Sequence, residues 1–275
     1  MDFGLNGAAV CISGGTKGLG REAALAFARE GARVAVTGRG ADALARTISD
    51  LRQAGAPDAF GVQCDVGDLA SIEAAFDQID GRWGELNTLI NMAGPTDPSP
   101  GADFSEVPDE AWSHYLEVGI MSVVRCTRAA VPLMRKAGWG RVVNISSVSS
   151  RIGSAFEAPY VTAKSGLNGL TKNMAWALAK ENILINAVTP GVFTTEALRD
   201  YMQITGAAEK YDPENLADVW SWMREVQGGR HGGVIGRVAL PEEINPLLLL
   251  LGSPANSYIV GANIPIDGGT DFSPS

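Results

Sequence analysis

The stretch "SGGTKGLG" (Ser13–Gly20) places four glycines and one lysine between two segments of different character. Residues 8–13 form a short apolar run typical of a buried strand, and "REAALAFAREG" (Arg21–Gly31) has the length and composition of a helix. A glycine-rich turn at this place lets the backbone approach a ligand closely, and the first turn of the helix offers unpaired N–H groups to a pyrophosphate. The stretch therefore predicts a strand–turn–helix unit that binds a phosphate-bearing molecule.

The same alternation of strand and helix continues along the chain. The predicted strands are residues 8–13, 33–38, 59–65, 86–93, 140–147 and 183–190, and the predicted helices are residues 17–31, 41–54, 69–83, 112–137 and 160–181. Strands that alternate with helices are typical of βαβ units, in which helices cover both faces of a parallel sheet. We therefore expect an α/β fold: a doubly wound (Rossmann) parallel sheet with three layers, α/β/α, in a single domain over residues 1–275.

The amino-acid composition limits the classes of protein to which the chain can belong. Of the 275 residues, 45% are hydrophobic, which is enough for a sizeable core without disulfides or metals. The three cysteines are scattered through apolar segments, as is typical of reduced core residues in a cytoplasmic protein. A net charge of −9 argues against nucleic acid or an anionic membrane as a partner. We expect no signal peptide, and the apolar run Leu247–Leu251 is too short to span a membrane, so we expect it in the core.

Six short motifs, in order along the chain, resemble those of the short-chain dehydrogenase/reductase family. They are Gly14-x-x-x-Gly18-x-Gly20, "CDV" (Cys64–Val66), "NMAG" (Asn91–Gly94), "NISS" (Asn144–Ser147), "YVTAK" (Tyr160–Lys164) and "PGVFTT" (Pro190–Thr195). Each motif alone is weak evidence, but the set in this order is specific, and it extends over nearly the whole chain. The resemblance implies an oxidoreductase that interconverts a carbonyl and a secondary alcohol by hydride transfer with a nicotinamide cofactor.

The resemblance also implies roles for residues at the motif positions. The implied catalytic residues are Ser147, Tyr160 and Lys164. The implied cofactor-binding residues are Gly14, Thr16, Lys17, Gly18, Leu19, Gly20, Arg39, Asp65, Val66, Asn91, Ala93, Gly94, Tyr160, Lys164, Pro190, Gly191, Val192 and Thr195. We expect no metal site, because the chain has only two histidines.

Hydride-transfer chemistry accounts for the residue types in the implied catalytic set. Tyr160 and Lys164 are four residues apart, so they share one face of a helix. A phenol with a pKa of about 10 is a poor acid or base near neutrality, and an ammonium together with an oxidised nicotinamide would lower that pKa. We therefore expect Tyr160 to act as acid/base with a pKa lowered in part by Lys164. Ser147 would hold the substrate oxygen while negative charge develops on it.

One position departs from the family pattern. The family usually has an asparagine in the helix after the fourth strand, where its backbone carbonyl extends a proton relay from the lysine. Here "YLEVGIM" places Gly119 at that position. Glycine keeps the carbonyl but lacks the side chain that braces the local distortion of the helix. An alternative function is therefore a cofactor-binding protein with impaired catalysis.

The charges near the glycine-rich turn favour NADP(H) over NAD(H). An NAD-preferring protein would place a carboxylate near Gly38 to accept hydrogen bonds from the ribose 2′-hydroxyl. Here there is no such carboxylate, and Lys17 and Arg39 offer two cations for a 2′-phosphate. The other interpretation is that both are solvated surface charges.

Residues 192–238 are expected to form a lid over the substrate. This segment is rich in aromatic side chains, which suits an apolar cyclic, aromatic or fatty ligand. The same aromatics could instead pack the lid against itself or against a neighbouring subunit. The predicted substrate residues are Ser149, Phe156, Trp220 and Trp222, and Pro95 is expected to line the cleft beside them.

Two further expectations concern partners. A 3-oxoacyl-carrier-protein-type reductase is a second alternative function, and it would need a basic docking surface for an acidic carrier. The candidates are Arg125, Arg128, Arg135 and Lys136, which could equally be a solvated face or part of a subunit interface. From the resemblance we expect a homotetramer or homodimer, formed through the two long helices and the C-terminal segment around residues 264–272.

Overall fold

The computed structural model describes residues 2–95, 104–153, 157–226 and 233–271, and these contain one seven-stranded sheet in which every pairing is parallel. The strand order is β3-β2-β1-β4-β5-β6-β7. The strands are β1 (Ala9–Ser13), β2 (Arg33–Gly38), β3 (Ala59–Gln63), β4 (Thr88–Asn91), β5 (Gly140–Ile145), β6 (Ile183–Pro190) and β7 (Asn263–Ile266). The chain moves outward from β1 in one direction and then, through β4, in the other. This is the doubly wound topology predicted from the sequence.

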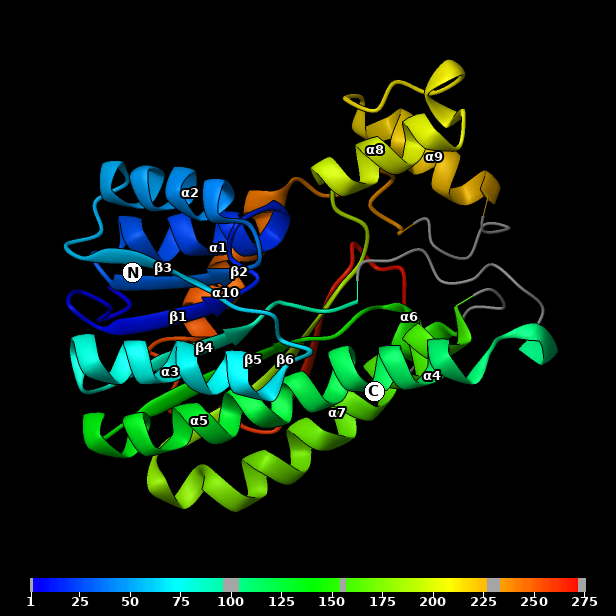
Figure 1. Cartoon of the computed structure of the whole chain (residues 1–275). Helices are drawn as coiled ribbons and strands as arrows, with labels where there is room; N and C mark the ends of the chain where they lie inside the picture. Colours follow the sequence, from blue (N-terminus) through cyan, green and yellow to red (C-terminus); the bar gives the residue numbers. More distant parts are fainter. Residues whose placement is uncertain (1, 96–103, 154–156, 227–232, 272–275) are drawn as a thin grey trace.

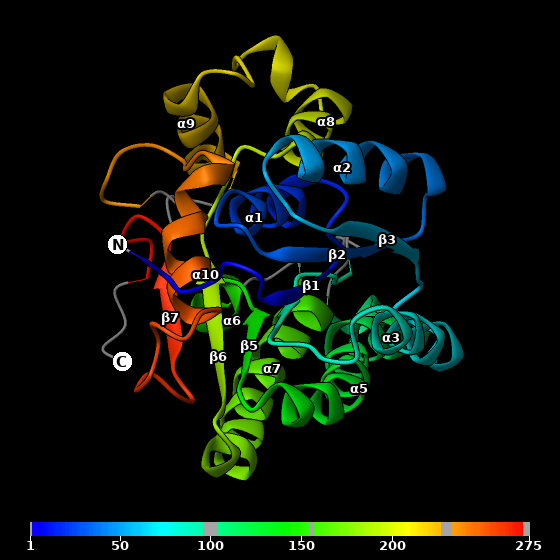
Figure 2. The ribbon, with the colours of Figure 1, turned by 90° about the vertical axis from the view of Figure 1, so that its left-hand side faces the viewer.

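Helices cover both faces of the sheet (Figures 1 and 2). On one face lie α1 (Gly18–Arg29), α2 (Ala41–Gln53) and α10 (Asn245–Leu251), and on the other lie α3 (Leu69–Trp83), α5 (Ser122–Ala137) and α7 (Ala158–Leu178). The shorter helices α4 (Asp109–Leu116), α6 (Ser149–Ile152), α8 (Glu196–Ile204) and α9 (Leu216–Val226) complete the described part of the chain. The three-layer arrangement is confirmed.

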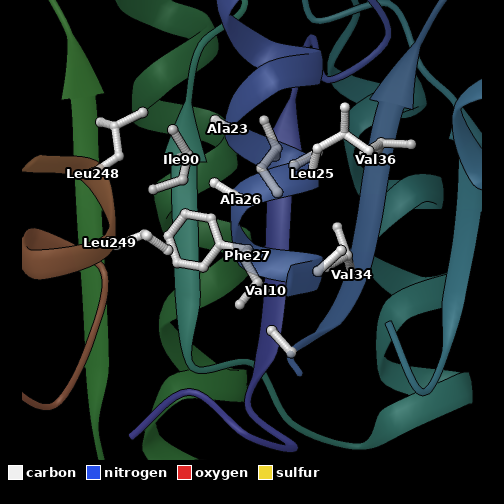
Figure 3. Packing of buried hydrophobic residues seen from close by; sticks show 14 of the residues in the cluster. Val10, Ala23, Leu25, Ala26, Phe27, Val34, Val36, Ile90, Leu248 and Leu249 are labelled. Carbon is white, nitrogen blue, oxygen red and sulfur yellow. The ribbon is translucent and has the colours of Figure 1, made fainter. Parts of the chain in front are cut away.

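The alternation of side chains along each strand separates two hydrophobic cores. In β1, Val10 and Ile12 point into the core under α1 and α10, whereas Ala9 and Cys11 point into the core under α3 and α5. Figure 3 shows Phe27 of α1 packed among side chains of β1, β4 and α10. Phe27 is fully buried, and burial of such a ring stabilises the fold by about 1.5–3 kcal/mol.

Two elements differ from the sequence prediction. The predicted helix 112–137 is interrupted, because a π turn at Glu117–Met121 separates α4 from α5. The seventh strand, β7, was not predicted. It has only four residues and contains Pro265, which lacks an N–H group and is therefore tolerated only at a sheet edge, where β7 lies. The run Leu247–Leu251 lies in α10, and Leu248, Leu249 and Leu251 are buried, as expected.

The region after β6 forms a unit with its own small core. Helices α8 and α9 stand apart from the three layers (Figure 1). The buried side chains Met202 of α8, Val219, Trp222 and Met223 of α9, and Val238 further along the chain form a separate hydrophobic cluster. Within the described residues, no helix is both long and apolar enough to cross a membrane.

Candidate active site

A cleft of about 890 Å³ opens at the turn between β1 and α1. The turn is tight: Gly14 has a φ of +70°, and a Cβ on Gly20 would fall on the carbonyl oxygen of Gly14. Glycine is therefore required at both positions. Lys17 precedes α1 in an extended conformation, and no side chain caps the helix. The first N–H groups of α1 thus remain available for an anion, so this turn fits a dinucleotide pyrophosphate.

Most of the predicted cofactor-binding residues line this cleft. They are Gly14, Thr16, Lys17, Gly18, Leu19, Gly20, Arg39, Asp65, Val66, Ala93, Gly94 and Thr195. Pro95 lines it as well. Asn91 does not: it is buried in β4, where its Nδ2 donates a hydrogen bond to Asn144 Oδ1 at 2.9 Å. This hydrogen bond ties β4 to β5.

The other predicted cofactor residues do not line this cleft: Tyr160 and Lys164 lie on α7, and Pro190, Gly191 and Val192 lie at the end of β6 and just after it. The carbonyl oxygen of Pro190 accepts a hydrogen bond from the N–H of Val148 at 2.9 Å, which ties this segment to the one that carries Ser147. A Cβ on Gly191 would lie 2.8 Å from Asp267 Cα, so the chain can pass there only as glycine. Thr195 caps α8 and lies beside the glycine-rich turn, 3.6 Å from where a Cβ on Gly18 would be.

The sequence did not point to the contribution of α4. Ser113, His114 and Glu117 line the cleft from α4 and the π turn that follows it. The only signal was indirect: in a doubly wound fold the segment after the fourth strand begins beside the ligand crevice.

The charged side chains near the carboxyl end of β2 are those that the sequence predicted: two cations, and no carboxylate at Gly38. Lys17 and Arg39 are exposed in the cleft, and neither has a carboxylate partner in the described part of the chain. A Cβ on Gly38 would lie 2.8 Å from Thr16 Cγ2, so the fold itself resists a carboxylate side chain at that position. The cleft is therefore lined by these two cations as well as by the carboxylates of Asp65 and Asp68.

Two elements, β5 and α7, bring Ser147, Tyr160 and Lys164 together. Ser147 follows β5, and Tyr160 and Lys164 lie one turn apart on α7. Lys164 is buried, and its Nζ donates a hydrogen bond to the carbonyl oxygen of Ile145 at 2.7 Å and lies 5.8 Å from the centre of the Tyr160 ring. The N–H of Ser149 donates to Ser147 Oγ at 3.2 Å, which leaves the Ser147 proton free to point elsewhere. The side chain of Ser147 is a hydrogen-bond partner of Tyr160.

Burial dominates the ionisation of this group. It raises the pKa of the Tyr160 phenol, and the hydrogen bond from Ser147 acts in the opposite direction with a smaller effect. Burial also lowers the pKa of Lys164 to about 8. The chain's own groups therefore do not produce the lowered pKa that the sequence predicted for Tyr160 in the presence of an oxidised nicotinamide, because desolvation of the phenol outweighs the hydrogen bond from Ser147.

Gly119 lies in the middle of the π turn and is buried. The distortion of the helix is thus present without an asparagine. Ser122 Oγ donates to the carbonyl oxygen of Val118 at 2.6 Å, which satisfies one of the carbonyls of the irregular turn. A Cβ on Gly119 would lie 2.9 Å from Ala163 Cβ, so α7 occupies the space that a side chain would need.

The predicted substrate residues have different environments. Trp220 shares a cavity of about 190 Å³ with Val192 and Ile235. Trp222 is buried in the core of α8 and α9, as the alternative interpretation of the aromatics proposed. Ser149 is buried at the start of α6, and Phe156 lies outside the described residues.

The candidate carrier-docking cations are mostly neutralised within the chain. Arg125 pairs with Glu117, Arg135 with Glu181 and Lys136 with Asp80. Only Arg128 of the four is exposed without a carboxylate partner among the described residues. Across the same residues there is no cluster of potential metal ligands.

Comparison with known proteins agrees with this geometry. The sequence pattern of the family described as short chain dehydrogenase matches residues 8–204. Cis-4-hydroxycyclohexanecarboxylate dehydrogenase of Sinomonas cyclohexanicum is 34% identical, over 94% of each chain. L-sorbose reductase of Gluconobacter frateurii, solved with NADPH and L-sorbose, has a TM-score of 0.88 at 27% identity over 99% of this chain and 100% of that one.

A third related protein is named as a polyketide ketoreductase. A variant of actinorhodin polyketide ketoreductase, solved with NADPH, has a TM-score of 0.83 at 31% identity, over 97% of this chain and 98% of that one. One of these three proteins is named a dehydrogenase and two are named reductases, and the two reductases were solved with NADPH. With the family match over more than half of its length, the chain belongs to the short-chain dehydrogenase/reductase family of oxidoreductases.

Proposed function

We propose that the chain is an NADP(H)-dependent ketoreductase that interconverts a carbonyl and a secondary alcohol, with Tyr160 as the acid/base. What supports this most is the grouping of Ser147, Tyr160 and a buried Lys164, whose Nζ lies 3.3 Å from where a Cβ on Gly94 of the cleft would be. A buried cation next to a phenol has a desolvation cost that a purely structural residue does not require.

The chain's own residues divide the work of proton transfer. The glycine-rich turn and the segment from Pro190 to Thr195 would hold a nicotinamide cofactor, which would supply or accept the hydride. In reduction, Tyr160 donates its proton to the carbonyl oxygen as that oxygen becomes an alkoxide. Ser147 donates a hydrogen bond to the same oxygen, and the Lys164 ammonium stabilises the phenolate that remains.

The preference for NADP(H) rests on Lys17 and Arg39. Both are exposed in the cleft near the end of β2 and lack an internal carboxylate partner among the described residues. A 2′-phosphate would supply the missing partner through charge-assisted hydrogen bonds. Two relatives in the comparison were solved with NADPH, which agrees with this assignment.

The substrate we propose is a small apolar or cyclic ketone, or the corresponding alcohol. Trp220, Val192 and Ile235 present apolar surface to one cavity, and Val192 belongs to the motif that we assign to the nicotinamide side. The carrier-linked alternative has less support, because three of its four candidate docking cations are paired within the chain.

We further propose a single-domain subunit that assembles into a dimer or tetramer through α5 and α7. Trp176 on α7 is 91% exposed, and tryptophan is enriched at interfaces between protein chains. Sizing chromatography that gives a monomer at micromolar concentration would contradict the assembly.

One assay tests the proposed function directly. Purified protein is mixed with NADPH or NADH and a panel of cyclic, aromatic and β-keto ester carbonyls, and the loss of reduced-nicotinamide absorbance is followed. We expect turnover with NADPH well above that with NADH, and none for the Tyr160→Phe variant. Tight NADPH binding without turnover on any carbonyl would support the alternative of a cofactor-binding protein.

A further inference from the structure

A second tyrosine lies against the acid/base. Tyr115, in the last turn of α4, is only 3% exposed, and its ring meets that of Tyr160 edge to face, with ring centres 6.3 Å apart and an interplanar angle of 86°. On its other side, the His114 ring packs against Tyr115 at 5.8 Å. The proposed reaction assigns no role to Tyr115, yet its ring covers the ring whose oxygen moves the proton.

The close packing of two helices places Tyr115 there. Four residues after it, Gly119 faces Ala163 of α7 with no room for a side chain between them. One residue further, the side chain of Ile120 reaches to 2.8 Å from where a Cβ on Gly166 would be. Small residues on both helices therefore bring α4 and the π turn against α7. This approach seats the large ring of Tyr115 over Tyr160, one turn before the contact.

A ring in this position can act on Tyr160 in two ways. An edge-to-face pair restricts the side-chain torsions of its partner, and such pairs favour one orientation over others. It also excludes water from one side of the phenol, which favours the neutral form. The groups that act on the Tyr160 phenol are Ser147, Lys164, Glu157 and Tyr115 itself.

We propose that Tyr115 is a positioning residue: its ring, seated by the contact of Gly119 with Ala163, holds the Tyr160 phenol in the orientation from which it transfers the proton. This inference rests on the proposed function, since it assumes that Tyr160 is the acid/base. It assigns the role to the ring and not to the Tyr115 hydroxyl.

Two substitutions separate the ring from the hydroxyl. Tyr115→Val removes the ring, and we expect kcat to fall about tenfold while KM for NADPH is unchanged, because an unrestrained phenol spends less time in the productive orientation. Tyr115→Phe keeps the ring, and we expect this variant to have a kcat within about twofold of that of the parent. For alcohol oxidation, Tyr115→Val should also move the ascending limb of the kcat–pH profile to lower pH, because water then reaches the phenol.

A matched control distinguishes positioning from loss of stability. Phe60 and Trp83 form another edge-to-face pair, at 4.9 Å and 79°, between β3 and α3. Phe60→Val should lower the unfolding temperature like Tyr115→Val but leave kcat and its pH profile unchanged. A Tyr115→Val protein with the kcat and pH profile of the parent overturns the inference, and so does a Tyr115→Phe protein as slow as Tyr115→Val.

One further variant distinguishes a failure of this inference from a failure of the proposed function. Tyr160→Phe is measured alongside. If it is inactive while Tyr115→Val matches the parent, the proposed function stands and the role of Tyr115 is wrong. If Tyr160→Phe retains the activity of the parent, the acid/base assignment fails and the role of Tyr115 falls with it.

Discussion

A Cβ atom placed on Gly119 would lie 2.9 Å from Ala163 Cβ, closer than side chains pack. Gly119 is thus a packing residue between the π turn and the helix that carries Tyr160 and Lys164. This changes what the departure from the family asparagine means. The position does not simply lack a side chain, because Ala163 of α7 occupies the space that the side chain would fill.

We therefore expect Gly119→Asn to impair the protein, although it restores the residue usual in the family. Overpacking at a buried contact costs about 1–3 kcal/mol, and the strain falls on Ala163, next to Lys164. The free energy of unfolding from urea titration and kcat should both decrease. Ala163→Gly in the same chain should recover part of each loss by making room.

Two alanine variants give the control for this prediction. Gly119→Ala adds only the clashing Cβ and should destabilise, whereas Gly169→Ala adds a methyl to an exposed position of α7 with open space around it. Gly169→Ala should raise the free energy of unfolding by up to about 1 kcal/mol, because alanine has a higher helix propensity than glycine. Equal effects of the two substitutions would show that the contact with Ala163 is not tight.

Arg39→Ala should change the choice of cofactor. If Arg39 contacts the 2′-phosphate, its loss should raise KM for NADPH about tenfold and leave KM for NADH nearly unchanged, since NADH has no such group. Arg46→Ala is the matched control: Arg46 is also exposed and without a carboxylate partner in the described ranges, but it does not line the cleft. Similar KM changes for both cofactors, or for both variants, would contradict the assignment.

The sequence predicted the fold because its signals are local and repeated. Strand-length apolar runs and glycine-rich turns recur with little interruption, and the parallel order follows from the βαβ connections. The predicted strand 33–38 and helix 69–83 have the observed bounds. The strand β7 was missed because four residues with a proline carry almost no periodic signal.

The sequence predicted the parts of the site in which a short motif fixes the backbone. It did not predict contacts between residues far apart in the sequence. The glycine-rich turn lines the cleft as its spacing indicated. By contrast, the Tyr115–Tyr160 contact joins residues from two helices 45 positions apart, and no pattern within either helix records it. The burial that raises the pKa of Tyr160 in the chain alone is a long-range property of the same kind, which the sequence does not reveal.

The pKa of Lys164 predicts a pH dependence of stability. In the folded chain this pKa is about 8, against an ordinary value of 10.5, so between these values the unfolded chain binds more protons than the folded one. Stability from this residue therefore rises with pH over the window from about 8 to 10.5, and below pH 8 the penalty for burying the ammonium is fully present. The whole penalty is about 3 kcal/mol.

A difference measurement isolates this contribution from other groups that titrate in the same window. The free energy of unfolding is measured from pH 7 to 10.5 for the parent and for Lys164→Met, without cofactor. The variant should be the more stable of the two at pH 7, and the gap should shrink as pH rises. A gap that stays constant would mean that Lys164 keeps its ordinary pKa in the fold.

The ion pair between Arg151 and Asp271 should matter more than those on the surface. It joins α6, which follows Ser147, to the C-terminal segment, and the Asp271 side chain is only 2% exposed. Breaking a buried pair leaves one charge without compensation, which costs about 3–5 kcal/mol. Arg151→Ala should lower the free energy of unfolding by about that amount. It should also lower kcat, because α6 is then less firmly held beside the acid/base.

The pair of Arg135 with Glu181 is the matched control, because both side chains are largely open to water. Exposed pairs contribute little, so Arg135→Ala should leave the unfolding curve and kcat unchanged. The Asp271→Asn variant completes the comparison. It keeps the shape of the side chain but removes the charge that faces Arg151, so a loss of stability similar to that of Arg151→Ala would assign the effect to the ion pair. A stable Asp271→Asn protein would assign it to the packing of the arginine stem.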